Sequence, residues 1–197
     1  KDDIFFAIKG NKNDGNKFIS HSFKNKASLA IVNKIQKKLK INNQIKVKNT
    51  LKFLTDISGI FRKNINTKII AITGSCGKTS LKELLGNTLK KISNVSISPR
   101  SFNNKYGVPL SLFNLNYADN YGVLEVGMDK KGEIDNLSKI IKPNVSVITN
   151  INYAHAKNFN NIKSIALAKS EIIYNTKPKG YIVLNADDRF FKLHKTI

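Results

Sequence analysis

Residues 68–80 read KIIAITGSCGKTS, and this stretch decides the fold expected for the chain. Its apolar first half is typical of a buried strand, and a turn with two glycines leads from it into a segment of helical periodicity, residues 78–91. Gly74 and Gly77 allow the backbone to turn so that its N–H groups point at an anion, and the positive end of the helix adds to the attraction. The stretch therefore predicts a site for nucleotide phosphates between a strand and a helix.

Two residues at the start of the predicted helix have the side chains that such a site requires. Lys78 is expected to reach the β- and γ-phosphates of ATP, and the Thr79 hydroxyl is expected to bind Mg²⁺. The strict phosphate-loop pattern is not met, because its first glycine falls at Ile72. Cys76 is interpreted as filling a small-residue position, with a reactive thiol at a helix N-terminus as the alternative. The predicted nucleotide-binding residues are Thr73, Gly74, Ser75, Cys76, Gly77, Lys78, Thr79 and Ser80.

The rest of the chain alternates between short apolar segments and segments of helical periodicity. From residue 68 onward the expected order is β-α-β-(α)-β-α-β-α-β, which favours an α/β fold with a mainly parallel sheet and helices on both faces. A smaller α/β unit precedes it, and the boundary is expected in the stretch 64–67, which gives domains 1–66 and 67–197. Strands are expected at residues 4–8, 29–32, 68–73, 95–98, 121–126, 145–149 and 181–184, and helices at 50–63, 78–91, 133–141 and 162–174.

Composition limits the class of protein. The chain has 197 residues, of which 41% are hydrophobic, so a core can be buried. No apolar run approaches the roughly 20 residues of a membrane-spanning helix, and no signal peptide is visible. The single cysteine, Cys76, excludes an internal disulfide framework and favours a reducing compartment. The sequence does not begin with methionine, so we expect that the true N-terminus is missing.

The charge is strongly basic, with 34 Lys and Arg against 13 Asp and Glu, a net charge of +21. One interpretation is a polyanionic partner such as nucleic acid. The other is a bias towards A/T-rich codons, combined with an anionic small substrate. The second is favoured, because the basic residues are almost all lysines, spread along the chain, whereas nucleic-acid readers also use arginine for its bidentate geometry. The arginines are Arg62, Arg100 and Arg189.

The nucleotide loop resembles that of the Mur ligase family, which typically reads T-G-[ST]-x-G-K-[ST]. Five further segments are similar to motifs of the same family in the same order. They are SFNNKYGVP at 101–109, LEVGM at 124–128, AH at 154–155, AKSEI at 168–172 and NADD at 185–188. The sequence departs from the family's pattern at Asn16, at 129–130 and at 156–157, which bears on substrate contacts more than on the ATP chemistry.

The first residues refine the resemblance. DDIFFAIKG at 2–10, followed by Asp14, Gly15 and Phe18, is similar to the UDP-binding N-terminal domain of the type that adds D-alanyl-D-alanine. The resemblance implies a bacterial, cytoplasmic ATP-dependent ligase of peptidoglycan precursor synthesis. Its substrates would be UDP-N-acetylmuramoyl-tripeptide and D-alanyl-D-alanine, joined through an acyl phosphate. The alternatives are a sister type that adds a single amino acid, a P-loop kinase and a basic nucleic-acid-binding module.

The resemblance also implies the roles of individual residues. Lys78, Glu125, His155 and Lys169 would be catalytic. Two Mg²⁺ ions, with Mn²⁺ as a possible substitute, would be bound by Thr79, Glu125, His155 and a carbamylated Lys169. Asn103 and Asn104 would contact the peptide substrate, and Asp14 and Gly15 would shape a loop near the uridine nucleotide. Without the resemblance, Glu125, His155, Lys169, Asn103 and Asn104 could equally be ordinary turn, loop or surface residues, whereas the roles of Lys78 and Thr79 follow from the loop itself.

Members of the family are more than twice as long as this chain. The resemblance therefore implies a fragment with an incomplete central domain and no C-terminal domain. Because the family's site lies between domains, the 197-residue chain is expected to be inactive by itself. A monomer that binds neither nucleic acid nor membrane is expected.

Overall fold

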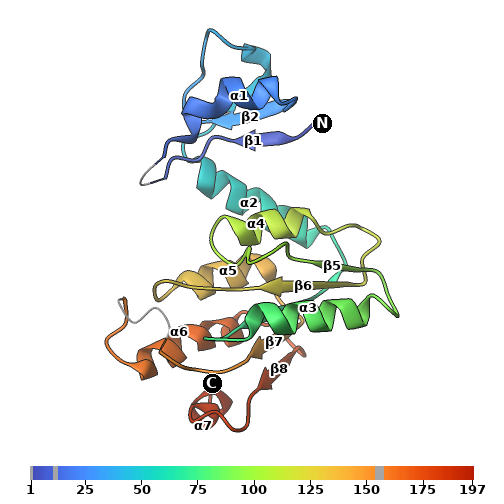
Figure 1. The fold of residues 1–197 in the computed structure, drawn as a ribbon, viewed down its shortest axis with the longest axis vertical. Helices are drawn as coiled ribbons and strands as arrows, with labels where there is room; N and C mark the ends of the chain where they lie inside the picture. Colours follow the sequence, from blue (N-terminus) through green and yellow to red (C-terminus); the bar gives the residue numbers. More distant parts are fainter. Residues whose placement is uncertain (1, 11–12, 154–157) are drawn as a thin grey trace. The chain divides into compact units, whose positions relative to one another are not determined.

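The computed structural model describes residues 2–10, 13–153 and 158–197 (Figure 1). The chain forms two compact units, Lys1–Ile57 and Ser58–Ile197. Each unit has a parallel sheet of its own, with three strands in the first and five in the second among the described residues. None of the described helices is both long and apolar enough to cross a membrane.

The first unit is a small α/β sandwich. Its core is formed where Ile19 packs with Ala7, Ala30 and Val32, all of them fully buried. Thr50 is buried where the last helix of this unit begins, and its Oγ1 donates to the carbonyl of Ala7 at 3.1 Å. The sheet order is β1-β2-β3, with the strands β1 (Ile4–Phe6), β2 (Leu29–Val32) and β3 (Gln44–Lys46), the helices α1 (Ile19–Lys24) and α2 (Thr50–Lys63), and the 3₁₀ turns η1 (Gly15–Phe18) and η2 (Ile41–Asn43).

The sheet of the second unit has the order β5-β6-β4-β7-β8, with every neighbouring pair parallel. The strand β4 lies at its centre, and since helices cover both faces of the sheet, five of its six residues are buried. In register, Ile72 of β4 lies beside Glu125, and Thr73 lies beside Ile148, so the carboxyl ends of three strands meet. The strands are β4 (Lys68–Thr73), β5 (Val95–Ile97), β6 (Tyr121–Glu125), β7 (Val145–Ile148) and β8 (Tyr181–Leu184).

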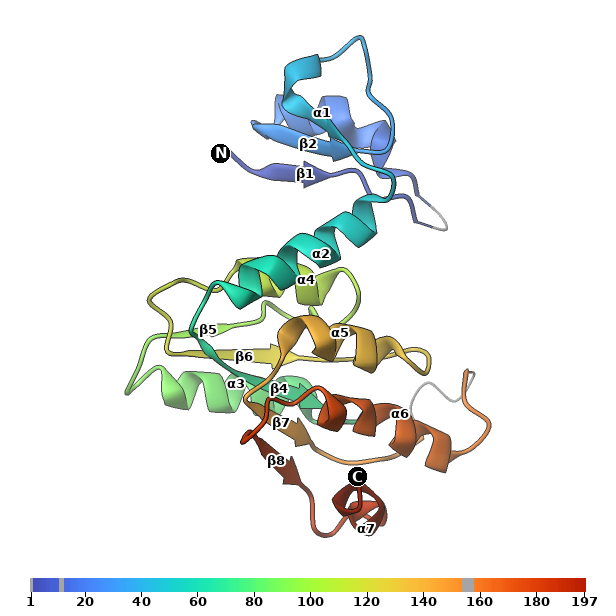
Figure 2. The ribbon, with the colours of Figure 1, turned by 180° about the vertical axis from the view of Figure 1, so that it is seen from behind.

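Helices cover both faces of this sheet, as the sequence predicts. Alternate residues of β4 point to opposite faces: Ile70 and Ile72 pack with α3, whereas Ile69 and Ala71 belong to the core under α4, α5 and α6. Figure 1 shows α3 in front of the sheet, and Figure 2 shows α5 and α6 in front of its other face. The helices are α3 (Lys78–Leu89), α4 (Gly107–Phe113), α5 (Glu133–Ile141), α6 (Ile162–Tyr174) and α7 (Phe191–Lys195).

Short elements are where the structure adds to the expectations. The strand β3 and the helices α1 and α7 are three to six residues long, too short for apolar periodicity to show them. Ends of predicted elements differ by one or two residues, as for β1, expected to reach residue 8 but ending at Phe6.

The division between the two compact units falls inside α2, between Ile57 and Ser58, whereas the sequence suggested a boundary in the stretch 64–67. The reason is that the last turns of α2 pack within the second unit. The ring of Phe61 lies 5.5 Å from that of Phe113, centroid to centroid. Arg62 is buried, and it donates from Nε to the carbonyl of Ile141 at 2.8 Å and from Nη1 to that of Ile65 at 3.1 Å. Burial lowers the pKa of its guanidinium.

We therefore expect Lys63 and its neighbour Arg62 to respond differently to substitution. Arg62→Met leaves two carbonyls without their charged donor, and the free energy of unfolding should fall by about 2 kcal/mol. Lys63→Met, on the exposed side of the same helix, should change it by less than about 0.5 kcal/mol. Chemical denaturation measures both, and equal effects would contradict the role given to Arg62.

Candidate active site

The loop between β4 and α3 has a backbone that only glycine allows at two positions. Gly74 has φ +144°, and a Cβ placed on it would lie 1.9 Å from Oγ1 of Thr149. Gly77 has φ +78° and directly precedes the first residue of α3, Lys78. Both glycines thus shape a turn that ends at a helix N-terminus, where backbone N–H groups favour anions.

The segment that follows β7 holds this loop in place. The Ser75 N–H donates to the carbonyl of Asn150 at 2.9 Å, and the Cys76 N–H donates to the side-chain Oδ1 of the same asparagine at 3.0 Å. Thr149 donates from Oγ1 to the carbonyl of Cys76 at 2.6 Å. The thiol of Cys76 is exposed, so the contacts that fix this residue are those of its backbone. Asn150 was not singled out from the sequence, because nothing local marks it as a partner of the loop.

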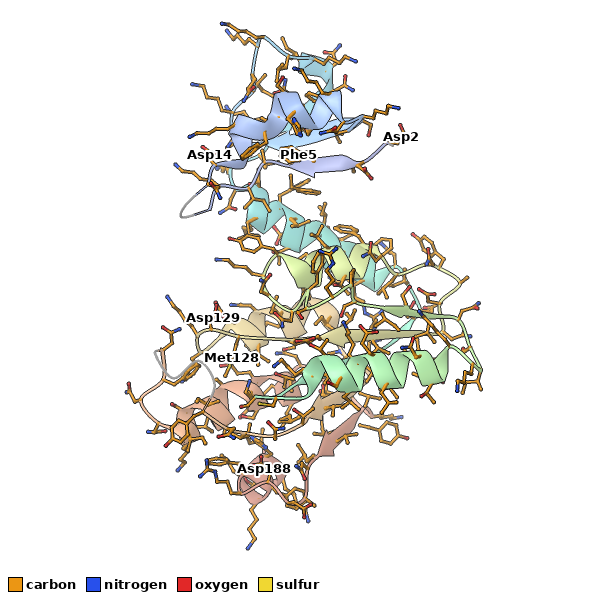
Figure 3. All side chains as sticks on the ribbon, viewed as in Figure 1. Asp2, Phe5, Asp14, Met128, Asp129 and Asp188 are labelled. Carbon is orange, nitrogen blue, oxygen red and sulfur yellow. The ribbon has the colours of Figure 1, made fainter. Side chains whose placement is uncertain are left out.

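The NADD motif, which follows β8 much later in the chain, supports the same segment. Asp188 accepts the N–H of Ile151 at Oδ2 (2.7 Å) and the N–H of Phe190 at Oδ1 (2.8 Å). Its carboxylate therefore joins the turn after β8 to the segment after β7, which in turn holds the loop. Asp188 is labelled in Figure 3.

Two lysines converge on one atom of the loop. Nζ of Lys78 donates to the carbonyl of Gly74 at 2.9 Å, and Nζ of Lys169, from α6, donates to the same oxygen at 3.0 Å. Lys169 is 2% exposed. Burial, and secondly the charge of Lys78, lowers the pKa of Lys169 from 10.5 to about 8. The charged form of this buried amine is therefore less favoured than that of an exposed lysine.

Glu125 ends β6 with its carboxylate between two neutral donors. Oε2 accepts the hydroxyl of Thr79 at 2.7 Å, and Oε1 accepts Nδ2 of Asn103 at 2.7 Å. The residue is 2% exposed, and among the described residues no ion pair joins it to a cation. A buried carboxylate without a cationic partner is costly, and a divalent cation would compensate its charge.

The donor set at this point fits Mg²⁺. A carboxylate and a hydroxyl are the hard oxygen ligands that Mg²⁺ takes beside nucleotide phosphates. Within residues 2–10, 13–153 and 158–197, no three His, Cys, Asp or Glu side chains gather as a complete metal cage. His155 lies outside the described residues, and Nζ of Lys169 contacts the carbonyl of Gly74, so the site expected for a second ion stays a prediction.

A cleft of about 500 Å³ opens beside these groups. Its basic lining residues are Lys78, Lys105 and Lys169, and its acidic ones are Asp129 and Glu133. Met128 and Asp129, labelled in Figure 3, follow β6 on the loop that leads to α5. The cleft is lined by Lys78, Asn103, Asn104, Lys105, Tyr106, Gly127, Met128, Asp129, Glu133, Asn136, Leu137 and Lys169. A charged ligand with an anionic and a cationic end would suit it.

The two asparagines of the SFNN segment have different positions. Asn103 contacts Glu125 and lines the cleft. Asn104 accepts the N–H groups of Tyr106 and Gly107 at its Oδ1, 3.0 Å each, which fixes the start of α4. The side-chain oxygen of Asn104 is therefore already occupied by hydrogen bonds within the loop. Contact of either side chain with a substrate stays a prediction.

Glu171 has a role that its motif did not reveal. It lies two residues after Lys169 on α6, and its carboxylate accepts the N–H of Gly132 at 2.8 Å and that of Asp135 at 3.0 Å. These two N–H groups belong to the first turn of α5, where a carboxylate compensates the helix dipole. Helix α6 thus fixes both the lysine beside the loop and the start of the helix that lines the cleft.

In the first unit, Asp14 and Gly15 lie at a turn that follows β1. Asp14 accepts the backbone N–H of Asn16 at 2.9 Å and its side-chain amide at 2.7 Å, and the side-chain bond is the first cause of a lowered pKa of this carboxyl. A Cβ on Gly15 would lie 2.6 Å from the backbone N of Ile8, so the turn needs glycine. A cleft of about 450 Å³ lies here, lined by Ile8, Lys9, Asp14, Asn16, Asn33, Lys34, Lys48, Asn49, Thr50 and Leu51.

Comparison with known proteins agrees with this geometry. The profile of the Mur ligase middle domain matches residues 72–196. The chain is 38% identical over 193 residues to a UDP-N-acetylmuramoyl-tripeptide–D-alanyl-D-alanine ligase of Buchnera aphidicola from Acyrthosiphon pisum, covering 98% of this chain and 42% of the relative. It is 36% identical to the same-named ligase of Rickettsia prowazekii, with coverages of 97% and 42%. The chain thus spans about two fifths of the length of these relatives.

Solved structures show the same similarity. A crystal structure of MurF from Acinetobacter baumannii superposes with a TM-score of 0.91 at 35% identity, covering 98% of this chain and 43% of that one. MurF from Thermotoga maritima in complex with ADP superposes with a TM-score of 0.85 at 32% identity, covering 98% and 45%.

The lowered pKa of Lys169 predicts how stability depends on pH. The folded chain holds this proton less tightly than the unfolded chain, where the pKa is 10.5, so the unfolded state binds more protons between about pH 8 and 10.5. Stability is therefore reduced below pH 8 and recovers as the pH rises through this window. Between pH 7.5 and 10, the free energy of unfolding of the wild type should gain about 2–3 kcal/mol relative to Lys169→Met.

Denaturation of both proteins at several pH values gives this difference in the free energy of unfolding. The contributions of groups that titrate equally in both proteins cancel in the difference. A difference that does not change with pH would contradict the buried, charge-repelled environment of Lys169.

Proposed function

Since the chain belongs to the Mur ligase family, we propose that it is part of an ATP-dependent ligase that joins D-alanyl-D-alanine to UDP-N-acetylmuramoyl-tripeptide. The observation that carries the proposal is the contact between Thr79 and Glu125 beside a glycine-shaped phosphate loop with two lysines at its carbonyl. The similarity to MurF along almost the whole chain, first unit included, supports the choice of acceptor.

The chemistry is the activation of a carboxylate. A carboxylate oxygen of the tripeptide attacks the γ-phosphorus of ATP, ADP leaves, and an acyl phosphate forms. The neutral amine of D-alanyl-D-alanine then attacks the carbonyl carbon, inorganic phosphate leaves with one oxygen of the former carboxylate, and the amine loses a proton. Both steps need charge neutralisation and positioning more than covalent help from the protein.

We propose that the described residues meet these requirements in the following way. The turn at Gly74 and Gly77 leads into the N-terminus of α3, whose backbone N–H groups would face the phosphates, because those of Ser75 and Cys76 are bonded to Asn150. Lys78 would neutralise the negative charge that moves from the γ-phosphoryl group to ADP. Thr79 and Glu125 would hold Mg²⁺. The ion, when bound, neutralises phosphate charge and orients the phosphoryl group for in-line transfer. The cleft between the basic and acidic groups would place the two reacting substrates next to each other.

Lys169 is proposed to act as a carbamate. A neutral buried amine can attack CO₂ and lose a proton, which converts a cation into an anionic oxygen ligand. Its lowered pKa and its place beside the loop support this conversion. With His155 it would complete a second Mg²⁺ site, which Mn²⁺ could also fill. The carbon-13 signal of a lysine carbamate, in labelled bicarbonate, should be present in the wild type and missing from Lys169→Met; its presence in both would reject this role.

The first unit is proposed to bind the uridine nucleotide. Its cleft has three lysines, Lys9, Lys34 and Lys48, that suit a diphosphate, and the turn at Asp14 and Gly15 forms part of the wall. We further propose that the protein acts as a monomer in the bacterial cytoplasm, and that neither nucleic acid nor membrane takes part.

The test is a coupling assay with the complete open reading frame that encodes this chain. UDP-N-acetylmuramoyl-tripeptide, ATP and Mg²⁺ are incubated with D-alanyl-D-alanine, single amino acids or no amine. Product should form only with D-alanyl-D-alanine. Lys78→Met should reduce kcat at least about 10²-fold, because it removes the cation that stabilises the transferred phosphoryl group.

The matched control is Lys90→Met, an exposed lysine that follows α3, which should leave kcat unchanged. Product with a single amino acid would assign the chain to a sister type of ligase. ATP binding without product from any amine would reject the proposal.

A further inference from the structure

Lys82 is a charged residue that the proposed chemistry does not use. It lies on α3 one turn after Lys78, and its side chain is completely buried. Nζ donates to the carbonyl of Ser98 at 2.8 Å and to that of Arg100. Its one described carboxylate partner is the adjacent Glu83, at 3.0 Å, whose side chain is half exposed.

A lysine in this position is costly for the fold. The ammonium gives up its hydration and gains two backbone carbonyls and a partly solvated carboxylate in return. An apolar side chain of similar length could fill the space at lower cost, which suggests that the two carbonyl contacts themselves matter.

Those contacts hold residues 98–103, the first part of the segment that connects β5 to α4. Arg100 has φ +46°, a left-handed backbone that a non-glycine residue adopts only when its surroundings enforce it. Lys82 bonds to the carbonyls of Ser98 and of Arg100 itself, so it fastens the segment on both sides of Pro99.

Both ends of this segment contact Glu125. At one end, Oγ of Ser98 accepts the backbone N–H of Glu125 at 3.2 Å. At the other end, Asn103 donates to Oε1 of Glu125 at 2.7 Å, and its carbonyl accepts the N–H of Gly127 at 2.7 Å. The carboxylate therefore has its orientation set by a segment that Lys82 fastens to α3, the helix that carries Thr79 and Lys78.

We propose that Lys82 is a positioning residue: by fastening residues 98–103 to α3, it orients Glu125 towards Thr79 and so sets the affinity of the site for a divalent cation with its nucleotide. The inference rests on the nucleotide and metal part of the proposed function and is independent of the acceptor amine. The same helix thus provides the groups that contact phosphate and, through Lys82, the frame that holds the metal-side carboxylate.

The experiment compares Lys82→Met with Lys90→Met in the complete protein. Lys82→Met keeps the length of the stem and removes the charge and the donors, whereas Lys90 is exposed at the end of the same helix. ADP affinity is measured with and without Mg²⁺, and the side-chain amide of Asn103 is followed by NMR. Lys82→Met should reduce the gain in ADP affinity that Mg²⁺ provides by about ten-fold, as expected when a group behind a metal ligand is lost.

Without Mg²⁺, the ADP affinity of Lys82→Met should stay close to that of the wild type, and the Asn103 signal should move towards the position of a solvated amide. Lys90→Met should change neither quantity. An unchanged Mg²⁺-dependent gain and an unchanged Asn103 signal, with only lower stability, would overturn the inference and leave Lys82 a packing residue. If Lys82→Met does not fold, Lys82→Gln takes its place, which removes the charge and keeps two N–H donors on a shorter side chain. The same reduced Mg²⁺-dependent gain and the same shift of the Asn103 signal are expected of it.

The wild-type measurement separates the two proposals. If Mg²⁺ gives the wild type no gain in ADP affinity, the nucleotide chemistry of the proposed function is overturned, and this inference with it. If the wild type shows the gain and Lys82→Met shows it equally, only the role of Lys82 is overturned.

Discussion

The carbonyl oxygen of Gly74 accepts hydrogen bonds from two ammonium groups, those of Lys78 and Lys169, and the arrangement of the site depends on this one atom. Burial leaves little water to screen the repulsion between them, and the pKa of Lys169 is lowered by that burial and then by the charge of Lys78. An anion in the loop would relieve the repulsion. The proposed phosphate site and the lowered pKa of Lys169 would therefore both follow from this one contact.

The parallel sheet brings these groups together from distant parts of the chain. β4 places Gly74, β6 places Glu125, and β7 leads to Asn150, because the carboxyl ends of parallel strands meet at one edge. Helix α6 adds Lys169, which lies 95 residues after Gly74 in the chain. Hydrogen bonds then fix the loop and the carboxylate. Asn150 holds the loop, and Thr79 of α3 and Asn103 of the segment that follows β5 hold the carboxylate of Glu125 between them.

The sequence predicted what depends on local pattern. The loop with Gly74 and Lys78, the strand before it and the parallel sheet follow from short-range signals and are present in the structure. It could not predict Asn150 or Lys82, because their partners lie far away in the chain and their residue types are abundant here. The division of the two compact units between Ile57 and Ser58 depends on contacts of the same kind, because Arg62 donates to the carbonyl of Ile141 far along the chain.

The central claim is that this site transfers a phosphoryl group from ATP to a carboxylate. The direct measurement uses UDP-N-acetylmuramoyl-tripeptide labelled with oxygen-18 in its terminal carboxylate, with ATP, Mg²⁺, D-alanyl-D-alanine and the complete protein. Mass spectrometry of the released inorganic phosphate should find one labelled oxygen for each peptide bond formed, because the acyl phosphate passes that oxygen to phosphate. Unlabelled phosphate released in step with product would show that the carboxylate never becomes phosphorylated, and it would contradict the account.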